Sequence, residues 1–328
     1  MKQNSAVLLV NFGGPRKLAE IEPFLRALLT DRDVIRTRFP TLLHNYLFGR
    51  IAKKRAREIT KDYDLIGGGS PIFADTEAVA EALYSHLHIP ILTFHRYLPS
   101  THDLALSAIE AMPLASISVF PLFPQFSFAT TGSIARMFTK RLSKAALNKL
   151  HWVHSYPTHP AYIALLQRNI RAFLETKRLS EEEVILLFSA HGLPQKFVDT
   201  GDCYQDEVVA SFQNVMEAFP KALGKLAYQS KFGPGEWIKP YTVDVCEQIR
   251  GWHEGREHVI FVPISFTSDH IETLFEVEKQ YLPIVADQGL MAYRLPAFNR
   301  DAAWVEAITS ILQDFTPFDT GALVRKTS

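Results

Sequence analysis

The sequence predicts an α/β fold with two similar doubly wound lobes, each with a roughly four-stranded parallel sheet flanked by helices. Short runs rich in Val, Ile, Leu and Phe alternate with longer segments of helical periodicity. The apolar runs are nearly continuous, which is typical of strands buried on both faces of a parallel sheet. The length of 328 residues fits two ordinary domains of about 150 residues each.

Eight apolar runs are predicted to be strands: Ala6–Phe12, Ile91–Phe94, Ser116–Phe120, His151–Ser155, Val184–Ser189, Lys225–Gln229, Val259–Ile264 and Met291–Leu295. Helices are predicted near residues 16–29, 41–62, 74–87, 102–111, 131–145, 159–176, 204–218, 240–253, 269–280 and 299–313. Prolines near residues 145–160 predict a boundary between an N-terminal lobe, 1–150, and a C-terminal lobe, 151–328. The last helix is a candidate to pack back on the first lobe.

Composition excludes several classes of protein. The 35 basic and 35 acidic residues give zero net charge, which argues against a protein that grips a nucleic-acid backbone. The two cysteines, Cys203 and Cys246, are far apart and cannot form a cysteine-rich metal site, and their scarcity fits a reducing compartment. No apolar run approaches the roughly 20 residues of a membrane span. We therefore expect a cytoplasmic protein with at most a peripheral membrane contact.

Ligands of such folds bind outside the carboxyl ends of the strands, so the residues that follow each strand carry the functional signal. A nucleotide site is not predicted, because Gly13-Gly14-Pro15 lacks the dinucleotide-binding spacing and Gly67–Ser70 lacks the lysine of a phosphate loop. A hydrolase nucleophile elbow, G-x-S-x-G, is also missing from the sequence. Nucleotide binding, the function usually expected of this architecture, is therefore disfavoured.

A histidine and two carboxylates are the strongest candidates for chemistry. His191 ends a very apolar strand and titrates near neutrality, although a structural hydrogen-bonded histidine is the alternative interpretation. Glu272 and Glu276 lie four residues apart on a helix predicted to start near Ser268, which places both on one face. The alternative is a solvated acidic face. Together they offer a base and hard oxygen ligands for a transiently bound divalent cation, not a resident zinc ion.

Several stretches resemble the ferrochelatase family, whose members insert ferrous iron into a porphyrin. The most specific is Leu187–Pro194 followed by Gly201–Tyr204. The others, in the family's order, are Val10–Pro15, Ile66–Ile72, Arg96-Tyr97, Pro124–Ser127, Thr130–Ser133, Tyr228–Pro234 and Ser268–Leu274. The resemblance implies two α/β lobes that enclose a porphyrin cleft, with a lid from the N-terminal lobe.

The resemblance also implies roles for individual residues. His191 matches the histidine proposed to take pyrrole protons, Glu272 the carboxylate that faces it across the macrocycle, and Glu276 an acidic residue on the metal or proton path. These three are the candidate metal ligands, and the first two the catalytic pair. Matches to substrate-binding positions are the cleft-lining Phe12, Phe123, Trp237 and Phe266, and the propionate-holding Arg55, Tyr63 and Ser70. By composition alone, the aromatic residues fit core packing and Arg55 fits a solvated basic helix face.

The expected activity is insertion of ferrous iron into protoporphyrin IX to form protoheme, the last step of heme biosynthesis, with release of two pyrrole protons. Gram-positive relatives that metallate coproporphyrin tend to have a tyrosine where this chain has Phe12, which favours protoporphyrin. Coproporphyrin or another tetrapyrrole is the alternative substrate. A non-catalytic heme or porphyrin carrier is the alternative of a different class.

The resemblance bears on cofactors and partners as well. Animal members bind a two-iron cluster through cysteines, whereas this chain has Phe128 at the internal position and no cysteine in residues 315–328. We expect no permanently bound cofactor and no iron–sulfur cluster. Residues 39–50 resemble the apolar lip of the family's active site. With the basic residues that follow, this lip is a candidate for contact with an anionic membrane or with the preceding porphyrin-pathway enzyme, and an ordinary amphipathic helix is the alternative.

Overall fold

The computed structural model describes residues 4–325 and divides into two units. The first unit comprises Met1–Ser155 and Arg300–Ser328, and the second comprises Tyr156–Asn299. The first boundary lies a few residues after the predicted one. Strand β4 (Leu150–Trp152) spans the predicted position and pairs with the first sheet, so the whole strand belongs to the first unit. The segment from Arg300 onward was expected in the C-terminal lobe, apart from its helix, but it is part of the first unit.

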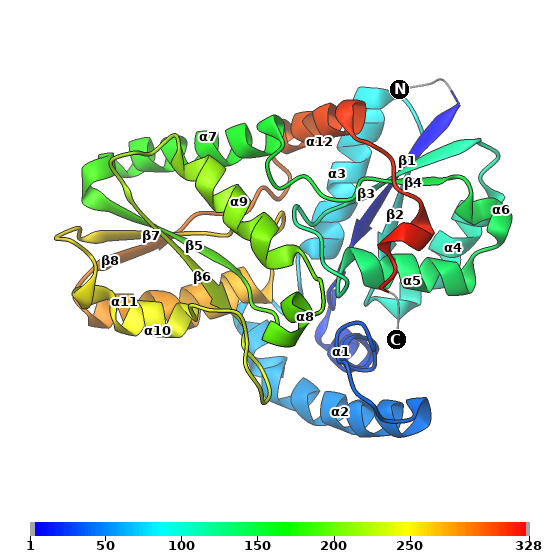
Figure 1. Ribbon diagram of the computed structural model, residues 1–328, viewed down its shortest axis with the longest axis horizontal. Coiled ribbons are helices and arrows are strands. Elements are labelled where there is room, and N and C mark those ends of the chain that lie inside the picture. The colour runs from blue at the N-terminus through cyan, green and yellow to red at the C-terminus, as the bar shows by residue number, and fades with distance from the viewer. Residues whose placement is uncertain (1–3, 326–328) are drawn as a thin grey trace. The chain divides into compact units, whose positions relative to one another are not determined.

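The first unit is built on a parallel sheet of four strands in the order β2-β1-β3-β4 (Figure 1). The other three strands are β1 (Ser5–Asn11), β2 (Ile91–His95) and β3 (Ser116–Pro121). Every residue of β1 is buried, as expected for the central position that a continuous apolar run favours. The register sets Val10 beside Phe94 and Leu9 beside Phe120, so these two phenylalanines lie on opposite faces.

Aromatic side chains attach helices to both faces of this sheet. Helix α5 (Thr131–Arg141) packs Phe138 against Phe94 and Trp152, with ring centroids 4.8 and 5.7 Å apart. On the other face, α12 (Ala302–Asp314) places Trp304 6.1 Å from Phe120. The remaining helical segments of the unit are η1 (Leu18–Glu20), α1 (Ile21–Leu29), α2 (Thr41–Leu65), α3 (Ile72–Leu87), η2 (Pro99–Thr101), α4 (His102–Ala111), α6 (Lys144–Leu147) and η6 (Thr320–Leu323).

The second unit repeats this plan with the strand order β6-β5-β7-β8, again all parallel (Figure 1). Its strands are β5 (Val184–His191), β6 (Leu223–Gln229), β7 (His258–Val262) and β8 (Met291–Arg294). Its helical segments are α7 (Pro160–Lys177), η3 (Glu181–Glu183), α8 (Gln195–Asp199), α9 (Tyr204–Met216), α10 (Thr242–Glu247), η4 (Ile249–Gly251), η5 (Glu272–Tyr281) and α11 (Leu282–Asp287). One face packs Leu187 against Val277 and Tyr281 of η5, and the other packs Phe188 against Phe212 of α9.

The fold class is confirmed, and all eight predicted strands occur in the described residues. The helix predicted near 269–280 differs, because η5 is a π-helix that continues into α11. Its buried residues Thr273, Val277 and Tyr281 are spaced by four. A π-helix turn holds more than four residues, so this spacing stays close to one face there. The helix predicted near 240–253 is divided into α10 and η4, and α8 was not predicted.

Replacing Phe138 with alanine is expected to destabilise the first unit by about 3–5 kcal/mol, because the fully buried ring would leave a cavity beside the sheet. Thermal unfolding followed by circular dichroism measures the effect. Phe39→Ala is the matched control, since that ring is 45% exposed and its removal opens no cavity. Equal melting temperatures for wild type and Phe138→Ala would contradict the packing described here.

Membrane-spanning helices were also sought within residues 4–325. None of the helices there has the combination of length and hydropathy needed to cross a bilayer.

Candidate active site

His191 lies at the carboxyl end of β5, next to Gln229 at the end of β6. The following residue, Gly192, donates its backbone N–H to the carbonyl oxygen of Gln229 at 2.8 Å. A Cβ atom at position 192 would lie only 2.9 Å from that oxygen and 3.3 Å from the Trp237 ring. Glycine therefore permits the close backbone approach that holds His191 at the edge of the sheet.

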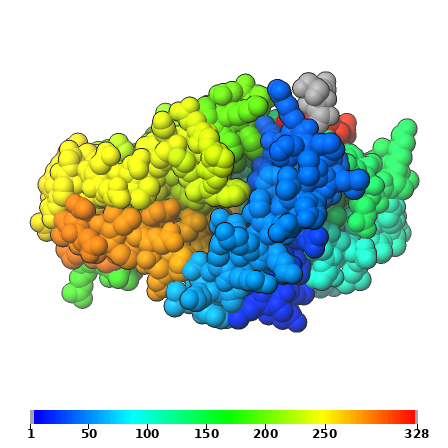
Figure 2. Space-filling view, turned by 90° about the horizontal axis from the view of Figure 1, so that it is seen from below, coloured from blue at the N-terminus to red at the C-terminus, as the bar shows by residue number. Residues whose placement is uncertain are grey.

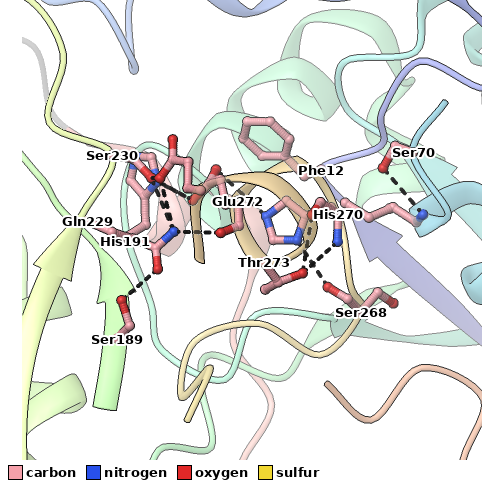
Figure 3. A network of polar contacts seen from close by, with 12 residues as sticks. Phe12, Ser70, Ser189, His191, Gln229, Ser230, Ser268, His270, Glu272 and Thr273 are labelled. Atoms are coloured by element: carbon pink, nitrogen blue, oxygen red, sulfur yellow. Dashed lines mark hydrogen bonds and ion pairs between the residues drawn. The ribbon is translucent and has the colours of Figure 1, made fainter. Parts of the chain in front are cut away.

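Glu272, at the start of η5, lies between two imidazole rings. Its Oε2 atom is 2.7 Å from His191 Nδ1 (Figure 3), and its Oε1 atom is 3.7 Å from His270 Nε2. A neutral His191 that donates its Nδ1 proton to Glu272 carries its lone pair on Nε2. Because the side chain of His191 is 38% exposed, this arrangement can present a base to a ligand.

Glu276, one turn further along η5, is held by the end of β6. Its Oε2 atom accepts hydrogen bonds from Gln229 Nε2 at 3.1 Å and from Ser230 Oγ at 2.5 Å. Ser230 Oγ also lies 3.1 Å from Glu272 Oε2 (Figure 3). The hydroxyl of Ser189 donates to Gln229 Oε1 at 2.6 Å, which orients the amide nitrogen towards the carboxylate. One connected network therefore links the ends of β5 and β6 to η5.

The network separates the pKa values of its two carboxyl groups. Burial raises the pKa of Glu272, but His191 and His270 outweigh it and hold that pKa far below its usual range. Burial and the charge of Glu272 raise the pKa of Glu276 to about 7. Burial lowers the pKa of His191, whereas Glu272 and Glu276 raise it, with a net increase. Two carboxyl groups with pKa values pushed apart are typical of acid–base sites.

Glu276→Gln is expected to flatten the pH dependence of thermal stability. A carboxyl whose pKa rises from 4.5 unfolded to about 7 folded contributes stability that is fully present below 4.5 and is lost as pH rises through 7. The pKa of His191 is also raised in the folded protein, so the stability that His191 contributes is likewise lost as pH rises above its unfolded pKa. Between pH 5 and 8 the wild type should therefore lose several degrees more in melting temperature than the variant. Parallel curves from calorimetry would contradict the raised pKa of Glu276.

The three predicted metal ligands, His191, Glu272 and Glu276, thus lie in one hydrogen-bonded network. Among residues 4–325, however, no group of three or more His, Cys, Asp or Glu side chains forms a ready-made metal site. The sequence predicted a passing rather than a resident cation, and metal binding by these residues stays a prediction.

Five predicted substrate-binding residues belong to the first unit: Phe12, Arg55, Tyr63, Ser70 and Phe123. Phe12 directly follows β1, and its ring lies 4.5 Å from that of Tyr97. Arg55, half-buried, and Tyr63, buried, both lie on α2, and Ser70 lies in the segment between α2 and α3. Phe123, half-buried, follows β3. Their roles in porphyrin binding stay predictions.

The other two predicted substrate-binding residues, Trp237 and Phe266, belong to the second unit. Phe266 follows β7, and its ring lies 4.8 Å from the ring of His270. Trp237 is buried and packs edge-on against Phe232 at 6.0 Å, and its ring also flanks Gly192. Both aromatic residues therefore adjoin the polar network.

Four residues of the network were not selected as site residues from the sequence: Ser189, Gln229, Ser230 and His270. All four lie within stretches that resemble the family, and Gln229 ends β6 while Ser230 follows it. The position of these two at a strand end was the available signal. Their partners were not predictable, because that requires knowing that β6 lies next to β5 and that η5 turns its acidic face towards both.

The first unit has a second buried polar network at the carboxyl end of β2. Asp31 accepts hydrogen bonds from Arg96 at 2.7 Å and from the Tyr97 hydroxyl at 2.8 Å, and also from Ser133. Arg96 additionally donates to Ser133 at 2.7 Å. These hydrogen bonds join the end of β2 to α5 and to the segment that follows α1.

Two solved structures resemble this chain in fold. CbiX, the terminal enzyme of siroheme biosynthesis in denitrifying bacteria, is 15% identical with a TM-score of 0.52, covering 93% of this chain and 98% of that chain. SirB from Bacillus subtilis is 10% identical with a TM-score of 0.55, covering 95% of both chains. At such low identity these likenesses show the fold alone.

Sequence comparison defines the family. The sequence model of the ferrochelatase family matches residues 4–315. The ferrochelatase of Chlamydia caviae is 44% identical over 98% of this chain and 99% of its own. Those of Chlamydia trachomatis serovar A and Chlamydia pneumoniae are 42% and 39% identical, covering 93% and 94% of this chain and 94% and 93% of their own. The chain therefore belongs to the ferrochelatase family.

Proposed function

We propose that this protein inserts ferrous iron into protoporphyrin IX and releases two pyrrole protons, forming protoheme in the last step of heme biosynthesis. Membership of the ferrochelatase family over nearly the whole chain supports an enzyme that inserts iron into a porphyrin. The observation that carries the proposal is the hydrogen-bonded set of His191, Glu272 and Glu276 at the edge of a sheet. It joins a base to carboxylates at positions that match the family's motif.

The geometry supplies what porphyrin metallation requires. A free-base porphyrin holds two N–H protons inside the ring, so a base must remove them before the metal enters. His191 Nε2 is that base in the proposal, and Glu272, 2.7 Å from Nδ1, stabilises the imidazolium that forms. Carboxylate oxygens also suit a hard divalent cation such as the ferrous iron substrate.

The proposal assigns the porphyrin itself to the predicted substrate-binding residues. Phe12, Phe123, Trp237 and Phe266 would contact the macrocycle, and Arg55, Tyr63 and Ser70 would hold its propionates through a guanidinium and two hydroxyls. Phe12 has no phenol oxygen, and this favours protoporphyrin over coproporphyrin, because relatives that use coproporphyrin tend to have tyrosine at that position. The vinyl side chains of protoporphyrin are also the less polar match for this aromatic set.

The proposal includes neither a resident cofactor nor an iron–sulfur cluster. The two cysteines are free, and burial raises the pKa of both Cys203 and Cys246 to about 12. Iron–sulfur clusters are held by several cysteine thiolates, so two cysteines far apart in the sequence do not supply their ligands.

A peripheral contact is proposed for the lip at residues 39–50, in a cytoplasmic enzyme that meets an anionic membrane or the preceding enzyme of the pathway. Helix α2, in blue, runs along the face shown in Figure 2. Within the lip, Leu42 is 85% exposed, and Phe39, Leu43 and Tyr46 are exposed as well. Exposed apolar groups followed by basic residues favour an anionic lipid surface. Flotation with anionic but not zwitterionic vesicles, lost in Leu42→Asp, tests this contact.

An anaerobic insertion assay tests the function. The purified protein, without nucleotide, is given ferrous iron with either protoporphyrin IX or coproporphyrin III, and heme formation is followed by absorbance. We expect protoheme to form, with a higher kcat/KM for protoporphyrin. Porphyrin binding without any insertion would identify a carrier and overturn the proposal. A higher kcat/KM for coproporphyrin would overturn the substrate assignment.

A further inference from the structure

The hydroxyl of Ser230 connects the two carboxylates of the network. Among residues 4–325, no direct hydrogen bond joins the side chain of Glu276 to that of Glu272 or His191. Ser230 Oγ instead lies 2.5 Å from Glu276 Oε2 and 3.1 Å from Glu272 Oε2. The chain of contacts therefore runs from His191 to Glu272, then to Ser230, and then to Glu276.

A hydroxyl differs from the other group that contacts Glu276. The oxygen of Ser230 can donate its own proton while it accepts another, as a proton relay requires. The amide nitrogen of Gln229 only donates, and the amide oxygen is occupied by the Ser189 hydroxyl at 2.6 Å. Gln229 thus fixes the position of Glu276 without passing a proton, and Ser230 is the group that can pass one.

The backbone of Ser230 supports a role for its side chain. Its φ of 63° lies in the left-handed region, which disfavours residues that have a Cβ atom. Glycine would adopt this conformation without strain. The side chain at this position instead places a hydroxyl between two carboxylates, and strain of this kind is concentrated at functional sites.

Glu276 is a suitable proton acceptor at the end of this chain. Its Oε2 atom ends the chain of contacts and accepts hydrogen bonds from Ser230 Oγ at 2.5 Å and from Gln229 Nε2 at 3.1 Å.

We propose that Ser230 relays a pyrrole proton from the His191–Glu272 pair to Glu276, and this rests on the proposed function. His191 Nε2 takes the proton, and the pyrrole nitrogen keeps the electron pair for iron. The Nδ1 proton moves to Glu272 Oε2. Ser230 Oγ accepts that proton as its own hydroxyl proton moves to Glu276 Oε2. One proton has then moved from the porphyrin to Glu276, nothing is oxidised or reduced, and rotation of the hydroxyl resets Ser230.

Ser230→Ala and Ser230→Gly test the relay in anaerobic single turnovers with ferrous iron and protoporphyrin IX in dilute buffer. Both lack the hydroxyl, but glycine also relieves the backbone strain, so it should be the more stable of the two. We expect both variants to lose about tenfold or more in rate. Added 2-methylimidazole, a small base, should restore their rates and leave that of the wild type unchanged.

The outcomes separate the relay from a structural role and from the proposed function. The relay is wrong if the more stable Ser230→Gly variant reacts at nearly the wild-type rate, because the rate loss would then reflect thermal stability. It is also wrong if the added base restores the rate of neither variant. Wild-type rates in both variants would also overturn it, while heme formation by the wild type would leave the proposed function standing. No heme from the wild type would overturn the proposed function itself.

Discussion

His191→Ala is expected to lower the single-turnover rate of iron insertion by about 10²–10⁴-fold, the usual contribution of a positioned general base. The variant removes the lone pair that takes the pyrrole proton and leaves Glu272 without its 2.7 Å partner. Stopped-flow absorbance under anaerobic conditions measures the conversion of porphyrin to heme. Fluorescence titration of porphyrin should show binding within a few-fold of wild type, because the base acts on the chemical step rather than on binding.

A second histidine of the same unit provides the control. His253 interacts through Nδ1 with the Arg256 carbonyl oxygen at 3.0 Å and takes no part in the network. His253→Ala should keep wild-type insertion. An equal loss in both variants would indicate a general effect on folding, and full activity in His191→Ala would contradict its role as the base.

Glu272→Gln is expected to have an effect of similar size, about 10²–10³-fold in kcat/KM, and also to shift the pH profile. The carboxylate raises the pKa of His191 and would stabilise its charged form, whereas a neutral amide does neither. The limb of the profile that reports His191 should therefore move to lower pH in the variant. The maximal rate should fall at the same time, because the imidazolium loses its counter-charge.

The pH profile of kcat/KM between pH 5 and 9 separates this account from a merely structural role for Glu272. Glu278→Gln is the matched control, since that glutamate lies on the same helix but pairs with Arg294 at 2.8 Å. The control should keep the wild-type profile. A limb at unchanged or higher pH in Glu272→Gln would contradict the electrostatic coupling of Glu272 to His191.

The strands were predictable because a run of apolar residues identifies each of them without reference to distant parts of the chain. Strand β5, for example, is buried along nearly its whole length, and its continuous apolar run indicates two covered faces. The end of the strand then placed His191 at an edge where ligands bind. The pair at 272 and 276 was placed on one helix face from spacing alone, and the structure agrees.

What the sequence could not predict depends on contacts between distant segments. The π-helical form of η5 differs from an α-helix by its hydrogen-bond register, which residue periodicity barely distinguishes. Helix α12 covers one face of the first sheet because Trp304 packs against Phe120, a contact between residues separated by more than half of the chain. Ser230 joins the network only because β5 and β6 are neighbours and its backbone turns left-handed.

The central claim is that the network removes pyrrole protons as iron enters the ring. Its most direct test is an anaerobic stopped-flow turnover of the wild type with ferrous iron and protoporphyrin IX, in which heme absorbance and a pH indicator are followed together. The account predicts two protons released per protoheme formed, with both signals slowed by about 10²–10⁴-fold in His191→Ala. Iron uptake without porphyrin metallation, or heme formation by His191→Ala at the wild-type rate, would contradict it.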